Sequence, residues 1–131
     1  MQGSETKTAT GTGSDFNAPH QHIAVEVCLD VTAAATAAGD TLDVFVQAFV
    51  GGQYVDVIHF TQVLGNGGTK RFFAKITADL AEAMFENASA LAAGSVRNLV
   101  SGRYRVRWTI GSASAPSFTF SVQASFINNN Y

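Results

Sequence analysis

Residues 103–110 alternate between polar and apolar side chains without a break, and this run constrains the fold more than any other part of the sequence. Successive side chains of a β-strand point to opposite faces of a sheet, whereas a helix spreads the same pattern around its surface. The run therefore predicts a half-buried strand with one apolar and one cationic face. The apolar face carries Tyr104, Val106, Trp108 and Ile110, and the cationic face carries Arg103, Arg105 and Arg107.

The same two-residue period predicts further strands before and after this one. We expect them over residues 21–30, 41–50, 53–60, 70–77 and 117–127, with a short strand between Ser95 and Val100. Gly51 and Gly52 predict a two-residue hairpin turn, because glycine tolerates positive φ. Six to eight antiparallel strands separated by Gly-rich turns predict an all-β fold. A sandwich and a small barrel both fit this pattern, and we favour the antiparallel β-sandwich.

Alternation also assigns side chains to faces. In residues 53–60 we expect one face with Tyr54, Asp56, Ile58 and Phe60, and an opposite face with Val55, Val57 and His59. The expected core contains Val44, Val46, Val106, Trp108, Phe118, Phe120 and Val122.

The chain divides by composition into three parts. Residues 1–20 hold Phe16 as their one large apolar side chain after Met1 and predict a flexible N-terminal arm, either disordered or ordered only against a partner. Residues 21–127 form the expected sandwich domain, and residues 128–131 a C-terminal tail. Residues 79–88 are the one helical candidate, and a looped excursion fits them equally well.

Composition limits the classes of function. Charged residues are 14% of the chain, there is a single cysteine, and no run of eighteen apolar residues occurs. Residues 1–69 carry seven acids and one base, whereas residues 87–131 carry four arginines and no acid. This polarity fits either a charge-matched head-to-tail assembly or a chance distribution over the strands. We expect no nucleic-acid or membrane partner and no cofactor.

Candidate catalytic and metal-binding residues are few, and none forms a persuasive constellation. His20, His22 and His59 are possible imidazole ligands, but alternate histidines before a strand are more typical of solvated positions. Cys28 lies in the middle of a strand, with no feature that would activate a thiol. The carboxylates at Glu26, Asp30, Asp43 and Asp56 fit a solvated sheet face better than an acid pair. We therefore expect a protein that is not an enzyme.

The strongest candidate for an interaction surface is the arginine stripe at Arg103, Arg105 and Arg107. It is an outer sheet face whose arginines pair with acids on neighbouring strands, a docking site for an acidic protein surface, or a site for nucleic acid or another polyanion. The aromatic residues of the same strand point to the opposite face and cannot stack beside the arginines, which disfavours nucleic acid. Phe45 and Phe49 fall on a nominally polar strand face, and Phe16 lies in the arm. We expect these three phenylalanines to be covered by contacts between subunits or with a partner.

Several segments together resemble small virion structural proteins of tailed bacteriophages, over roughly residues 25–125. They are Thr41–Gln47, Gly52–Val57, Phe60–Val63, Gly65–Gly68, Arg97–Leu99 and Arg103–Trp108. The resemblance implies a jelly-roll-like sandwich that acts as a head decoration or cement protein. Such proteins bind the major capsid protein on the outer capsid surface after assembly in the host cytoplasm, frequently as homo-trimers, and contribute no catalytic residues.

Two other functions remain open at this point. Related sandwiches also serve in phage tails and head fibres. A carbohydrate-binding module would use exposed tyrosine or tryptophan rings, but here the single tryptophan and most strand tyrosines fall on inward positions.

Overall fold

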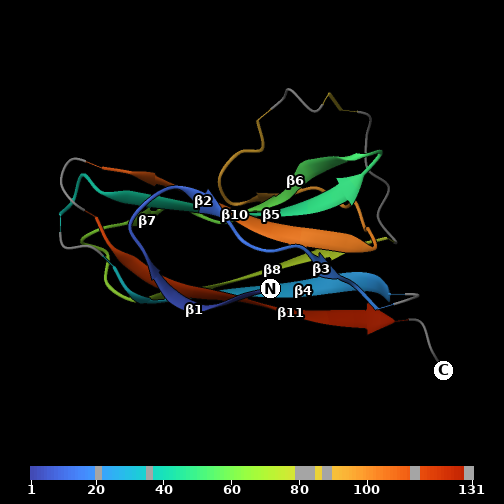
Figure 1. The fold of residues 1–131 in the computed structure, drawn as a ribbon, viewed down its shortest axis with the longest axis horizontal. Helices are drawn as coiled ribbons and strands as arrows, with labels where there is room; N and C mark the ends of the chain where they lie inside the picture. Colours follow the sequence, from blue (N-terminus) through green and yellow to red (C-terminus); the bar gives the residue numbers. More distant parts are fainter. Residues whose placement is uncertain (20–21, 35–36, 79–84, 87–89, 113–115, 129–131) are drawn as a thin grey trace.

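The computed structural model describes residues 1–19, 22–34, 37–78, 85–86, 90–112 and 116–128. Regular secondary structure in these ranges is β-strand, all strand pairs are antiparallel, and two sheets pack against each other in a sandwich-like arrangement (Figure 1). The expected all-β antiparallel class is confirmed. Most of residues 79–88, and residues 129–131 of the expected tail, lie outside the described ranges.

The smaller sheet has the strand order β1-β11-β4-β8, and the larger has the order β2-β10-β5-β6-β9, with β3 also paired to β10 and β7 to β5. The strands of the smaller sheet are β1 (Gln2–Lys7), β11 (Phe118–Asn128), β4 (His22–Ala33) and β8 (Lys70–Thr77). Those of the larger sheet are β2 (Gly11–Thr12), β3 (Phe16–Asn17), β10 (Arg103–Gly111), β5 (Thr41–Val50), β6 (Gln53–His59), β7 (Val63–Leu64) and β9 (Ser95–Val96).

The core lies between the two sheets. Every residue predicted for it is buried, including Trp108 on β10 and Phe120 on β11, whose rings meet edge to face with centroids 5.8 Å apart. The strict alternation of β10 and β11 is therefore a correct guide to their inward faces.

The hairpin turn is also as predicted, since Gly51 and Gly52 both have positive φ between β5 and β6.

In β6 the predicted alternation is wrong. The pairing with β5 passes from Val46–Ile58 directly to Gln47–Asp56, so β6 carries a β-bulge at Val57. A bulge adds one residue to one strand and reverses the faces beyond it. Ile58 is therefore buried beside Val57, and His59 lies on the outer face, opposite Phe45.

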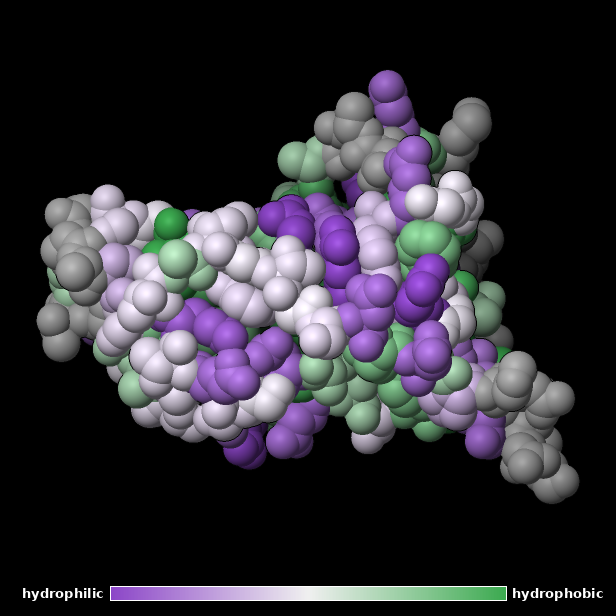
Figure 2. Space-filling model, viewed as in Figure 1, coloured by the Kyte–Doolittle hydropathy of each residue, from purple (hydrophilic) through white to green (hydrophobic). Residues whose placement is uncertain are grey.

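The expectation of a free N-terminal arm is also corrected. Residues 1–19 form a strap in which β1 pairs with β11 of one sheet, and β2 and β3 pair with β10 of the other (Figure 1). Trp108 Nε1 donates a hydrogen bond to the Ala9 carbonyl oxygen at 2.9 Å, and Phe16 stacks on Tyr104. Main-chain hydrogen bonds to strands of both sheets thus stabilise a segment that has few apolar side chains to bury. The side of the molecule that carries the strap mixes hydrophilic and hydrophobic residues (Figure 2).

We expect Phe120→Ala to lower the free energy of unfolding by about 3–5 kcal/mol, because it leaves a cavity in the centre of the core. Ser125→Ala on the exposed face of the same strand is the control, and it should leave stability nearly unchanged. Urea unfolding followed by circular dichroism measures both. An unchanged midpoint for Phe120→Ala would contradict the inward assignment of β11.

Gly11 tests the contact between the strap and β10. A Cβ atom at this position would lie 2.9 Å from Cζ2 of Trp108, closer than two carbon atoms can approach. Gly11→Ala should therefore cost about 1–3 kcal/mol or detach the strap. The fluorescence of Trp108, the only tryptophan, reports either result directly. Gly3→Ala is the matched control, since nothing lies within 4 Å of its added methyl group.

Candidate functional site

The arginine stripe lies on the outer face of the larger sheet. Arg103, Arg105 and Arg107 are all half-buried, and the residues between them on β10 face the core. The common direction that the alternation predicts is therefore confirmed. We call these three residues, together with the rings beneath them, the arginine face.

Each arginine of this face covers an aromatic ring from β5 or β6. The guanidinium carbon lies 3.9 Å from the ring centroid of Phe49 for Arg103, 3.8 Å from that of Tyr54 for Arg105, and 3.6 Å from that of Phe45 for Arg107. Cations over aromatic faces are attracted by the ring quadrupole, and burial strengthens the effect. Three cation–π pairs in a row thus fix the planes of the guanidinium groups.

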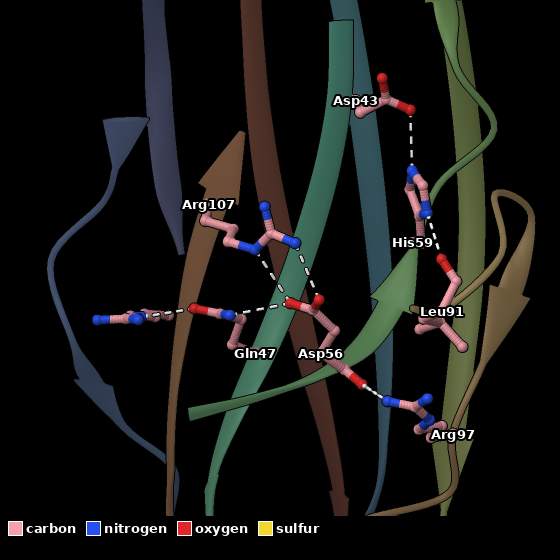
Figure 3. Close-up of polar contacts among 8 residues, drawn as sticks. Asp43, Gln47, Asp56, His59, Leu91, Arg97 and Arg107 are labelled. Atoms are coloured by element: carbon pink, nitrogen blue, oxygen red, sulfur yellow. Dashed lines mark hydrogen bonds and ion pairs between the residues drawn. The ribbon is translucent and has the colours of Figure 1, made fainter. Parts of the chain in front are cut away.

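A chain of hydrogen bonds also fixes the guanidinium edges of Arg105 and Arg107 (Figure 3). Arg107 donates from Nε to Asp56 Oδ1 at 3.1 Å and from Nη2 to Asp56 Oδ2 at 2.9 Å. Gln47 Nε2 donates to the same Asp56 Oδ1 at 2.9 Å, while Gln47 Oε1 accepts from Arg105 Nε at 2.7 Å. The bidentate pair at Arg107 matches the interpretation in which the stripe pairs with acids on neighbouring strands.

Phe45 and Phe49, which we expected contacts between subunits or with a partner to cover, pack against side chains of their own chain. Phe45 is 8% exposed, because Arg107 covers one part of it and the His59 ring stacks on it with centroids 3.9 Å apart. Phe49 is half-buried beneath Arg103. Phe16 packs on Tyr104 within the strap and is half-buried, so the chain itself covers Phe45 fully and the other two rings in part.

His59 is the most constrained of the candidate histidines. Its Nε2 lies 2.9 Å from Asp43 Oδ1, and its Nδ1 lies 2.7 Å from the carbonyl oxygen of Leu91 (Figure 3). His59 also lines a cleft of about 260 Å³ between β8 and β9. Because both ring nitrogens already face an oxygen, neither is directed at a ligand in that cleft.

The other candidate residues are separated in space. Both nitrogens of His22 contact the chain, at Tyr104 Oη and at the Pro19 carbonyl oxygen, and His20 lies outside the described residues. Among the residues that the structure describes, no three His, Cys, Asp or Glu side chains form a group that could hold a metal ion.

The four carboxylates do not form one site. Glu26 and Asp30 lie on β4 of the smaller sheet, whereas Asp43 and Asp56 lie on the larger one. Asp30 pairs with Arg71 at 2.9 Å. Cys28, between Glu26 and Asp30 on β4, is half-buried on the outer face of the smaller sheet.

Among the described residues, the tryptophan and tyrosine rings that could stack on a sugar are internal or covered. Trp108 and Tyr104 are buried, and burial raises the pKa of the Tyr104 phenol above its ordinary value. Tyr54 lies beneath Arg105, and its pKa is also raised, first by loss of hydration and then by the nearby Asp15 carboxylate.

The structure adds one surface residue that the sequence analysis missed. Phe73 on β8 is 75% exposed, the largest exposed fraction among the large apolar side chains described. The signal was the adjacent pair Phe72 and Phe73, because neighbouring positions of a regular strand point to opposite faces of the sheet.

No protein-family model matches this chain, and neither does any curated protein or solved structure. Within the described ranges there is no helix long and apolar enough to cross a membrane.

We expect Asp56→Ala to lower the free energy of unfolding by about 1–3 kcal/mol, because it leaves the half-buried Arg107 guanidinium and the Gln47 amide without their acceptor. Glu5→Ala is the control. It breaks the exposed pair with Lys7, and exposed pairs stabilise little, so its unfolding midpoint should not move. Equal midpoints for both variants would show that the network around Asp56 does not hold the arginine face.

Proposed function

We propose that this protein is a non-enzymatic structural protein of a tailed-phage virion that docks to an acidic protein surface through its arginine face. The observation that carries the proposal is the ordering of the guanidinium groups by three cation–π pairs and the Gln47–Asp56 network. A surface whose side chains are already fixed loses less entropy when a partner binds.

The arginine face retains binding capacity. Among the described residues, neither Arg103 nor Arg105 forms an ion pair, and the hydrogen bond from Arg105 to Gln47 uses only its Nε atom. A guanidinium group with free N–H edges recognises carboxylates in a bidentate geometry. Carboxylates on a capsid protein would therefore fit Arg103 and Arg105 best.

The resemblance to phage virion proteins gives this docking a biological setting. It supports a head decoration or cement role on the outer capsid surface, with a jelly-roll-like strand order as a further part of the proposal. The burial of Trp108 and Tyr104 favours this role over a sugar-binding module, which would need exposed rings. A tail or head-fibre position is the nearest variant of the same function.

The first experiment asks whether the protein travels with virions. Phage particles from cells that express the chain are separated on a density gradient, and each fraction is probed with an antibody. We expect the protein in the fractions that hold heads. Recovery with tails would place it at the alternative position, and recovery only in the soluble fractions would contradict the virion role.

The second experiment tests the docking surface. Arg105→Glu places a carboxylate where partner carboxylates are expected, so it should weaken binding to particles stripped of the protein by about tenfold or more. Raised salt should weaken wild-type binding as well. Lys70→Glu makes the same charge change on the other sheet and should bind normally. Normal binding by Arg105→Glu, with an unchanged melting temperature, would remove the arginine face from the contact.

A further inference from the structure

The outer face of the smaller sheet carries a second surface, centred on Phe73. This ring stands on β8, an edge strand of that sheet, and is 75% exposed. The ring forms one wall of a hollow of about 190 Å³, whose other lining residues lie on β4 and β11 and include Glu26, Cys28 and Ser125. A cavity of about 150 Å³ is enough to accept a benzene ring, so the hollow matches the size of a phenyl group.

The charges around Phe73 follow a regular pattern set by the register of β4 and β8. Glu26 pairs with Lys75, Cys28 with Phe73, and Asp30 with Arg71. Register partners point to the same side of a sheet, here the outer face. On this face β4 therefore presents an acid, a small thiol and an acid, while β8 presents a base, a phenyl ring and a base.

This pattern is self-complementary. A two-fold axis that runs parallel to the strands, midway between β4 and β8, places each residue of β8 over its own register partner in the other copy. Lys75 then faces Glu26, Arg71 faces Asp30, and the Phe73 ring enters the hollow over Cys28. We infer that two copies of this chain pair face to face through the smaller sheet, with Phe73 of each copy in the hollow of the other.

Pairing through the free edge of β8 fits less well. An antiparallel pair of β8 strands centred on Phe73 would set Arg71 of one copy against Lys75 of the other. Like charges on an edge strand are a common barrier to such pairing. The face-to-face contact avoids this repulsion and gives a dimer, in place of the trimer that the phage resemblance implies. The inference does not depend on a virion role.

Sedimentation equilibrium of the full chain over a range of concentrations tests the pairing. We expect a monomer–dimer equilibrium that Phe73→Ser weakens by about a hundredfold or more, since each copy loses the ring that it buries. Leu64→Ser is the control, because it removes another exposed apolar side chain on the other sheet. A wild-type monomer, a trimer, or equal loss in the two variants would overturn the inference.

A charge exchange tests the predicted orientation. Lys75→Glu alone should weaken the dimer, because it sets two glutamates opposite each other across the interface. Adding Glu26→Lys should restore it, since the exchanged pair is again complementary. Failure of the double variant to recover, with both variants folded by circular dichroism, would overturn the proposed axis.

The thiol of Cys28 gives an independent readout in the wild-type protein. Its reaction with a chromogenic disulfide should become slower by about tenfold as the concentration rises through the dimer range, because the partner's ring covers it. In Phe73→Ser the rate should stay high at every concentration. A wild-type rate that does not change while the dimer forms would place the contact elsewhere.

Discussion

The alternation of β10 is the constraint on which the rest of the structure depends. Its inward residues stand in the centre of the core, and two of them, Tyr104 and Trp108, also hold the N-terminal strap through Phe16 and the Ala9 carbonyl oxygen. Its outward arginines cover the rings of β5 and β6. A slip of one residue would exchange these faces, burying three cations and exposing a tryptophan, so register, core and outer surface are fixed together.

The long alternating strands could be predicted from the sequence, because the alternation of polar and apolar residues indicates directly which side chains are buried. The bulge at Val57 could not be predicted. It allows both Val57 and Ile58 to be buried against the opposite sheet, and the local sequence pattern does not show that both must be buried. The strap was missed for a different reason. The strap is held by main-chain hydrogen bonds to strands of both sheets, and amino-acid composition gives no information about main-chain pairing. The partner expected to order the segment is its own domain.

The candidate surface was predictable in position but not in detail. Alternation gave the direction of the three arginines, whereas their ring partners come from strands far away in sequence. Tyr104 and Trp108, the aromatic neighbours along β10, point to the other face, so the alternation of β10 by itself places no ring beside the arginines. Knowledge of the pairing of β10 with β5 and of β5 with β6 was needed to place Phe45 and Tyr54 beneath them.

The two outer faces of the molecule differ in their chemistry, and we propose a different kind of partner for each. On the larger sheet, cations and rings of the chain satisfy one another and leave ordered N–H edges at Arg103 and Arg105, which suits a charged partner. On the smaller sheet, a bare ring stands beside a hollow and charges of both signs, which suits a copy of the same surface. Because these faces lie on opposite sides of the sandwich, pairing through one leaves the other free. A dimer would present two arginine faces directed away from each other, so it could bridge two acidic partners and gain from the high effective concentration of the second site.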